Sequence, residues 1–334
     1  MTDAFATLQD WIEIDSVTGG EGDYGDALGR ALAAEGLGVE RQELSPGRFN
    51  VLARAANPEV VFCTHLDTVP PWFGSERKGN VVFGRGACDA KGPALAMLLA
   101  ARRLLAEGED RIGFLLTVGE ETDGAGAVFA NEQLADPWSP RFTIVGEPTD
   151  NSFVRGHKGV YKCNLRAHGV AGHSSQDVGP SAIHELVTVL QGILGDDWGE
   201  HARFGSGTVN VGEIGGGLAA NVVAPEAQAE LLLRIVQDPV AVTEKLRTHL
   251  TEHVELELGK NYGPVEFLVP EDQESIAVAF GTDAPHLSAW GTPLLYGPGS
   301  ILDAHTADEK LTLESFERAV DDYARTAAGL LGSE

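Results

Sequence analysis

Histidines and carboxylates that could bind a metal ion recur directly after apolar runs of this chain. The runs lie within VVFCTHLDTVPP (60–71), FGRGACDAKGP (83–93), IGFLLTVGEETDGAG (112–126) and FTIVGEPTD (142–150), and YGPGSILDAHTADE (296–309) adds a histidine far downstream. The candidate side chains are His65, Asp67, Asp89, Glu120, Glu121, Glu147 and His305. Because uncompensated carboxylates are costly to bury, several of them at the ends of predicted strands indicate a bound cation. The pattern is typical of a metal-dependent hydrolase.

His65 and Asp67 are two residues apart on a predicted strand, so their side chains share one face. The imidazole could bind a metal while the carboxylate accepts its other N–H and fixes the tautomer. A strand-end histidine followed by a capping aspartate would give the same pattern. Asp89 lies in a glycine-rich loop, where it could serve either as a metal ligand or as a helix cap.

Glu120 and Glu121 are the most informative pair in the chain. Adjacent carboxylates project in different directions, so one can bind a metal while the other faces the substrate as a general base. The alternative is two solvated residues in a turn before Asp123, and the mostly apolar run before the pair argues against it. Glu147, which precedes Pro148, closes another predicted buried strand.

The charge balance excludes some classes of partner. The chain has 334 residues and carries 50 Asp and Glu against 24 Lys and Arg, a formal net charge of −26. This excess argues against binding to nucleic acid or to an anionic membrane. A chain of this length is long for one compact unit, so we expect two domains.

Cysteine usage and the N-terminal sequence indicate a cytoplasmic protein. Cys63, Cys88 and Cys163 include no CxxC pair, which fits a reducing compartment. The first residues show no secretory signal, and no stretch approaches the roughly 18 apolar residues of a membrane span.

Hydrophobic spacing predicts an alternation of helices and strands in the first half of the chain. The predicted helices are 3–14, 22–36, 93–107 and 125–134, and the predicted strands are 49–54, 59–65, 112–119 and 142–146. Pro93 in the first turn and Gly108 after the last turn mark the ends of the third helix. With candidate ligands at strand ends, this order predicts an open, mostly parallel α/β sheet whose site lies at its carboxyl edge.

A different pattern begins near residue 157. Strands are predicted at 161–168, 208–217, 227–237 and 265–269, and helices at 181–195 and 239–254. The order strand–helix–strand–strand–helix–strand is that of a ferredoxin-like α+β unit. We therefore predict an inserted domain of residues 157–267 within a sheet domain of residues 1–156 and 268–334.

The motifs together resemble those of the co-catalytic zinc aminoacylase family. This family includes acetylornithine deacetylase, succinyl-diaminopimelate desuccinylase, aminoacylase and the glutamate-type carboxypeptidases. The motifs THLDTVPP, GRGACDAKG, GEETDGAG, VGEP and YGPGSILDAHTADE occur in the family's order and cover essentially the whole chain. The resemblance implies a two-metal amide hydrolase, and it implies that the inserted domain is a lid and dimerisation domain. We therefore expect a homodimer.

The resemblance also assigns roles to the candidate residues. The implied ligands are His65 and Glu147 for one metal, Glu121 and His305 for the other, and Asp89 as the bridge. Glu120 would be the general base, Asp67 would support His65, and the Asp89–Ala90 peptide bond would be cis. Nitrogen and oxygen ligands without thiolates suit two Zn²⁺ ions, with Co²⁺ or Mn²⁺ as substitutes.

Three residues of the inserted domain also match the resemblance. His173, in HGVAGHSS, would donate a hydrogen bond to the scissile carbonyl oxygen, often across a dimer interface. Asn221, in NVVAP, and Arg234, in LLLRI, would bind the substrate, and the family can use the arginine to hold a carboxylate. Alternatively, Asn221 caps a loop after three glycines, and Arg234 pairs with local acids.

The expected reaction is hydrolysis of an amide bond without a covalent intermediate. Two divalent ions would activate a water, and Glu120 would pass its proton to the leaving amine. We expect removal of the acyl group from an N-acyl amino acid such as N-acetylornithine. A dipeptidase, a carboxypeptidase and a succinyl-diaminopimelate desuccinylase are alternatives. Alanine follows Asp89 where many desuccinylases and acetylornithine deacetylases of the family have methionine, and the DAKG form also occurs in its deacylases of the lysine and ornithine branches and in its dipeptidases. A metal-holding binding protein without catalysis is the alternative of a different class, and Glu120 argues against it.

Overall fold

The computed structural model describes residues 4–332, and these form two compact units. The first unit comprises the residues up to Arg155, Glu266–Ile276 and the residues from Thr282 onward. The second unit comprises Gly156–Val265 and Ala277–Gly281. Compared with the predicted limits, the main difference is that residues 277–281 are grouped with the inserted unit.

The first unit is built on a mixed sheet of nine strands. In spatial order the strands are β1 (Gly38–Ser45), β2 (Arg48–Arg54), β6 (Ile112–Thr117), β3 (Val60–His65), β7 (Phe142–Val145), β19 (Thr292–Leu295), β8 (Phe153–His157) and β17 (Val265–Glu266), and β18 (Ser275–Val278) pairs with β8. The centre, β6-β3-β7-β19, is parallel, as predicted. The β1-β2, β2-β6 and β19-β8 pairs are antiparallel.

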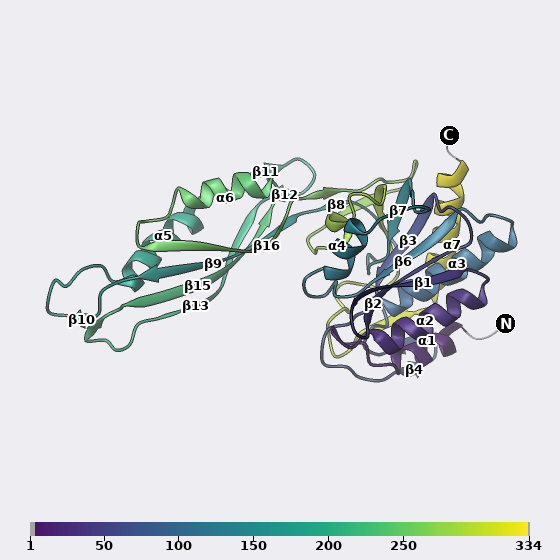
Figure 1. Cartoon of the computed structure of the whole chain (residues 1–334), viewed down its shortest axis with the longest axis horizontal. Helices are drawn as coiled ribbons and strands as arrows, with labels where there is room; N and C mark the ends of the chain where they lie inside the picture. The colour runs from purple at the N-terminus through teal and green to yellow at the C-terminus, as the bar shows by residue number, and fades with distance from the viewer. Residues whose placement is uncertain (1–3, 333–334) are drawn as a thin grey trace. The chain divides into compact units, whose positions relative to one another are not determined.

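Helices cover both faces of this sheet, which explains why its central strands are apolar throughout. Every residue of β3 and β6 is buried, as expected for parallel strands packed on both sides. The helices are α1 (Ala4–Ile12), α2 (Gly22–Ala34), α3 (Lys91–Ala106), α4 (Ala125–Glu132) and α7 (Leu313–Gly332). Four of them, α1, α2, α3 and α7, form one apolar core with the sheet, and α4 lies apart from these four (Figure 1). Phe62, Phe114 and Tyr323 are fully buried in that core.

A small three-stranded sheet brings two distant loops together. Its order is β20 (Lys310–Thr312), β5 (Val81–Phe83) and β4 (Glu76–Lys78). Lys310 pairs with Phe83 in an antiparallel register. The loop that follows β5 and the loop that precedes β20 therefore lie side by side. The first of these loops carries Asp89, and the second carries His305.

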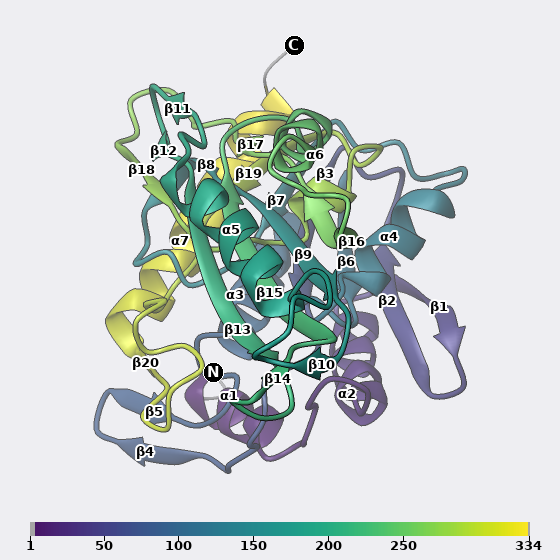
Figure 2. The ribbon, with the colours of Figure 1, turned by 90° about the vertical axis from the view of Figure 1, so that its left-hand side faces the viewer.

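The second unit has the strand order of a ferredoxin-like fold. Its elements along the chain are β9 (Gly159–His168), α5 (Ala182–Gly195), β13 (Thr208–Gly216), β15 (Glu226–Ile235), α6 (Pro239–Arg247) and β16 (Val254–Tyr262). The sheet order β13-β15-β9-β16 is antiparallel throughout. Helix α5 packs against β9 and β15 and shares their apolar core (Figure 2).

Two sequence predictions for this unit are wrong. The closing strand is β16, and residues 265–269 do not form it, since only Val265–Glu266 is a strand and it belongs to the larger sheet. Helix α6 ends at Arg247, well before residue 254. The sequence VELEL at 254–258 alternates apolar and charged residues, which suits a strand with one covered face.

Short elements complete the two units. They are β10 (Gly172–His173) paired with β14 (Val222–Val223), β11 (Glu200–His201) paired with β12 (Gly205–Ser206), and the 3₁₀ turn Ala284–His286. Across residues 4–332, none of the helices has both the length and the apolar content that crossing a membrane requires.

Candidate metal centre

Parallel strand pairing explains why residues far apart in sequence meet at one edge of the sheet. His65 is the last residue of β3, which lies between β6 and β7. The Glu120–Glu121 turn follows β6, and Glu147 follows β7 after a single glycine. Because these three strands run in the same direction, their carboxyl ends place the following residues together.

Asp89 lies between the two histidines. Its Oδ1 is 2.9 Å from Nε2 of His65, and its Oδ2 is 3.2 Å from Nε2 of His305. Each histidine also faces a glutamate: Nε2 of His305 is 2.9 Å from Oε2 of Glu121, and Nε2 of His65 is 3.8 Å from Oε2 of Glu147. The structure thus brings all five predicted ligands together as two His–Glu pairs with one aspartate between them.

The chemistry of this cluster fits divalent cations. Ligand atoms of His65, Asp89 and Glu121 all lie within 4.8 Å of one another. The donors are imidazole nitrogens and carboxylate oxygens, a set that suits zinc and related divalent ions. Buried carboxylates at such distances repel one another unless positive charge is placed among them.

The pKa values of His65, His305 and Glu147 are all raised, so each of these groups binds a proton more readily than usual. Burial opposes protonation of His65, yet hydrogen bonds with Asp67 and Asp89 raise its pKa well above the ordinary value. Hydrogen bonds with Asp89 and Glu121 raise the pKa of His305 to about 10. Burial raises the pKa of Glu147 to about 7.

Asp67 holds the turn that carries the glutamate pair. Its Oδ1 accepts the backbone N–H of Glu120 at 3.1 Å, and its Oδ2 accepts that of Glu121 at 3.2 Å. Thr18 donates its hydroxyl to the same Oδ2 at 2.8 Å. For Nδ1 of His65, the nearer acceptor is the carbonyl oxygen of Asp67 at 2.8 Å, while the carboxylate is 3.6 Å away. The carboxylate therefore holds the glutamate turn, and the backbone carbonyl of Asp67, where the carboxylate was expected, is the hydrogen-bond partner of His65 Nδ1.

Glu120 has the environment that a general base requires. Its side chain is partly buried, and burial followed by the charge of Glu147 raises its pKa well above the ordinary value. Both effects make the Glu120 carboxylate a better proton acceptor than an exposed glutamate. Asp283, which the sequence prediction did not include, is buried close by and accepts a hydrogen bond from Thr117 at 2.6 Å.

The loop that carries Asp89 is held by a residue that the sequence prediction missed. The Asp89–Ala90 peptide bond is cis, as predicted. Glu309 is fully buried and accepts hydrogen bonds from backbone amides of this loop, including that of Asp89 at 3.1 Å. Its place four residues after His305, within the motif at 296–309, was the available signal.

The three candidate residues of the second unit lie in two places. His173 is exposed on β10, and its Nδ1 accepts a hydrogen bond from the Ser175 hydroxyl at 2.8 Å. Asn221 is exposed next to β14, and its carbonyl accepts the N–H of Ser174 at 3.0 Å. These two are therefore neighbours. Arg234 lies near the far end of β15, where it pairs with Val160 and Thr208.

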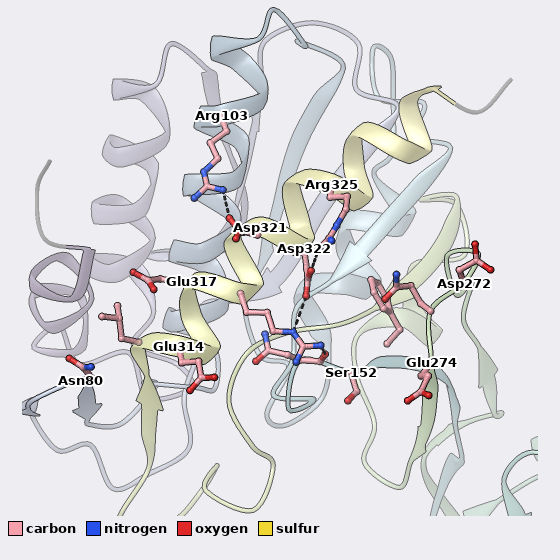
Figure 3. Close-up of a pocket in the computed structure, with 15 residues that line it drawn as sticks. Asn80, Arg103, Ser152, Asp272, Glu274, Glu314, Glu317, Asp321, Asp322 and Arg325 are labelled. Atoms are coloured by element: carbon pink, nitrogen blue, oxygen red, sulfur yellow. Dashed lines mark hydrogen bonds and ion pairs between the residues drawn. The ribbon is translucent and has the colours of Figure 1, made fainter.

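A large polar cavity lies elsewhere in the first unit. It measures about 1060 Å³ and is lined by residues of α7 and the segment 272–274, among others (Figure 3). Its three arginines are already paired with acids, Arg103 with Asp321 and both Arg318 and Arg325 with Asp322. Its lining includes none of the five predicted metal ligands, so this cavity is distinct from the candidate metal centre.

Comparison with known proteins shows the class to which this fold and site belong. The model of peptidase family M20/M25/M40 matches residues 61–329. An M20 domain-containing protein of Schizosaccharomyces pombe is 35% identical over 94% of this chain and 81% of its own length. A protein of Aspergillus clavatus named "Probable carboxypeptidase" is also 35% identical, over 94% of this chain and 86% of its own.

Solved structures share the fold at lower identity. The aminopeptidase PepT from Bacillus cereus matches 98% of this chain and 98% of its own with a TM-score of 0.84 and 18% identity. A Bacillus subtilis protein described as a dinuclear metal binding peptidase of the M20 family matches 99% and 98% with a TM-score of 0.75 and 15% identity. The chain is a hydrolase of peptide or amide bonds, and it belongs to peptidase family M20/M25/M40.

Proposed function

We propose that this protein is a two-metal hydrolase with Glu120 as its general base. The observation that carries the proposal is the position of Asp89, which presents one carboxylate oxygen to each of two His–Glu pairs. His65 and Glu147 would hold one ion, Glu121 and His305 the other, and Asp89 would contact both. The structural neighbour described as a dinuclear metal binding peptidase supports the number of two ions.

The chain's own residues divide the chemistry between them. When bound, two divalent ions, Zn²⁺ by preference and Co²⁺ or Mn²⁺ as substitutes, would polarise the amide carbonyl and acidify a water. Glu120 would accept the proton of the attacking water and deliver it to the leaving amine nitrogen. Asp67 fixes the backbone of the turn from which the Glu120 and Glu121 side chains extend.

The substrate that we propose is a short peptide with a free carboxylate. Relatives at 35% identity include one named as a carboxypeptidase, which favours peptides over the acyl amino acids expected from the motifs. Deacylation of an N-acyl amino acid such as N-acetylornithine is the second candidate. The DAKG sequence at 89–92 is compatible with both candidates, because the family resemblance gives this form to deacylases of the lysine and ornithine branches and to dipeptidases.

We further propose that the second unit is a lid and dimerisation domain. Its edge strand β13 is nine residues long and mostly exposed, and a free edge of this kind can pair with a second copy. The adjacent helix α5 exposes Ile183, Val187 and Leu194 on one side. His173 would donate to the scissile carbonyl oxygen, within its own chain or across a homodimer, while Asn221 and Arg234 would bind the substrate.

We propose a cytoplasmic location as well. All three cysteines of the chain are free and buried. Free cysteines favour a reducing compartment such as the cytoplasm, because disulfides form in oxidising compartments.

A hydrolysis screen tests the proposed function. Metal-free protein is loaded with Zn²⁺ or Co²⁺ and assayed against dipeptides, tripeptides, acetylornithine, acetyllysine and succinyl-diaminopimelate, with a chelator-treated sample as control. The proposal expects metal-dependent release of an amino acid, with peptides cleaved faster than acyl amino acids. Faster cleavage of acetylornithine would select the second candidate. No metal-dependent hydrolysis of any substrate would contradict the proposal.

A further inference from the structure

Glu309 makes an unusually concentrated set of contacts with the loop that carries Asp89. Its Oε1 accepts the backbone N–H groups of Gly86 at 3.0 Å, Cys88 at 3.2 Å and Asp89 at 3.1 Å. Three amides of one short loop therefore converge on a single carboxylate oxygen. Because Glu309 is fully buried, water does not compete for these donors.

The other oxygen of Glu309 is held by a buried arginine. Arg85 donates from Nη1 to Oε2 at 2.6 Å, and its side chain is only 2% exposed. Its Nε also donates to the carbonyl of Pro71 at 3.3 Å, and its guanidinium lies 5.0 Å from the centre of the Phe73 ring. The ion pair thus connects the Asp89 loop with the segment that follows Asp67.

The backbone of Glu309 is fixed independently of its side chain. Its carbonyl accepts the N–H of Gly84 at 3.0 Å, and the next residue, Lys310, begins the strand that pairs with β5. His305 lies four residues earlier on the same segment. One residue therefore joins three segments that carry candidate ligands or their supports: the region of Asp67, the Asp89 loop and the His305 loop.

We infer that Glu309 is a positioning residue that sets the place of Asp89 between the two histidines. The inference rests on the proposed function, because it gives Asp89 the role of bridging ligand. Without Glu309, three buried amides lose their acceptor and Arg85 becomes an unpaired buried charge, so the loop must rearrange. That rearrangement moves Asp89, since the amide of Asp89 is itself one of the three donors.

Two variants test the inference. Glu309→Gln keeps the shape but presents a neutral amide to both Arg85 and the loop, while Glu309→Asp keeps the charge but is too short to reach three amides. Supports of metal ligands typically change metal affinity or activity by about 10- to 100-fold. We expect Co²⁺ affinity and kcat to fall by about that factor in both variants, with KM within about twofold of wild type. The Co²⁺ absorption spectrum should change shape, because the ligand geometry changes.

Glu59→Gln is the matched control. Glu59 is bound by Arg111 at 3.1 Å and by Arg141 at 2.9 Å, next to the start of the strand that ends at His65. Its loss should lower the melting temperature while leaving Co²⁺ affinity and spectrum at wild-type values. This control separates a general loss of stability from displacement of the ligand loop.

The outcomes decide between the inference and its alternatives. If folded Glu309→Gln and Glu309→Asp both bind Co²⁺ as wild type does, with the same spectrum and kcat, the inference is wrong. If Glu59→Gln loses Co²⁺ affinity to the same extent, the effect is general destabilisation and the inference is also wrong. If the wild type binds Co²⁺ and the Glu309 variants lose it, but no substrate is hydrolysed, the proposed function fails while the positioning role stands.

Discussion

The candidate residues of the two units differ in how firmly the protein holds them. In the first unit His65, Asp89 and Glu147 are buried, and each lies close to another candidate ligand. In the second unit His173 and Asn221 are exposed, and they lie on or beside strands of two residues. The difference teaches that contacts among the candidate ligands preorganise the site of the first unit, whereas His173 and Asn221 are exposed to solvent in the described chain.

The largest effect is expected at the centre of the preorganised group. Asp89→Asn removes charge that both proposed ions share, so metal content should fall from two ions to one or fewer per chain, and activity should fall below detection. Elemental analysis after dialysis measures the metal, with the exposed Asp110→Asn as control. Wild-type metal content in Asp89→Asn would show that Asp89 does not bridge.

A large loss of rate without loss of metal is expected at Glu120. Glu120→Gln should lower kcat by about 10²- to 10⁴-fold, the usual contribution of a positioned general base, and should keep both ions. Steady-state kinetics on metal-loaded protein measures this, with the surface variant Glu132→Gln alongside. If the variant loses metal instead, Glu120 is a ligand and its role and that of Glu121 are exchanged.

A moderate effect confined to the transition state is expected at His173. Loss of one hydrogen-bond donor to a developing oxyanion typically lowers kcat by about 10²- to 10³-fold. His173→Ala should therefore lower kcat with little change in KM, while His184→Ala, on an exposed face of the same unit, should change neither. If His184→Ala lowers kcat as much as His173→Ala does, the loss at His173 is not evidence for a hydrogen bond to the oxyanion.

Mixing two inactive variants extends this test. If His173 acts across a homodimer, subunits of Glu120→Ala and His173→Ala should recover part of the activity after exchange. No recovery after verified exchange would place His173 in its own chain or outside the reaction.

The smallest effect concerns a buried histidine without a proposed catalytic role. Burial lowers the pKa of His157 to about 4, below the value of about 6.5 in an unfolded chain. Its contribution to stability is therefore fully present above pH 6.5 and is lost as the pH falls toward 4. The two pKa values correspond to at most about 3 kcal/mol.

Urea unfolding at pH 7 and at pH 4.5 measures this contribution. His157→Phe, which cannot be protonated, should lose less of its unfolding free energy between these two pH values than wild type does. An equal loss in both proteins would show that His157 does not contribute to acid sensitivity.

Long apolar segments that end in a ligand were the most predictable part of the molecule. Strands β3, β6 and β7 are placed within a few residues of their predicted limits, because buried parallel strands are apolar along their whole length. By contrast, β1 was not predicted, since its sequence GVERQELS is charged and largely exposed and its strand form depends on pairing with β2. Helix α7 was also missed, although Phe316, Val320 and Tyr323 repeat at helical spacing.

The supports of the site were harder to predict than its ligands. Glu309 accepts a hydrogen bond from the backbone N–H of Asp89, although the two residues are 220 positions apart in the sequence. Any residue except proline can donate a backbone N–H, so the sequence of the Asp89 loop does not reveal this contact. Likewise, the sequence indicated that Asp67 supports His65, but its bonds to the amides of Glu120 and Glu121 follow from the pairing of β3 with β6. Such supports depend on tertiary register, which local patterns do not contain.

Metal stoichiometry in the Glu120→Gln variant tests the central claim most directly, because it separates metal binding from turnover. The variant and the wild type are stripped of metal, titrated with Zn²⁺ and analysed by elemental mass spectrometry after removal of free ions. The account predicts two tightly bound ions per chain in both proteins, with hydrolysis by the wild type alone. One ion per chain in a fully active wild type would contradict a two-metal centre built around Asp89.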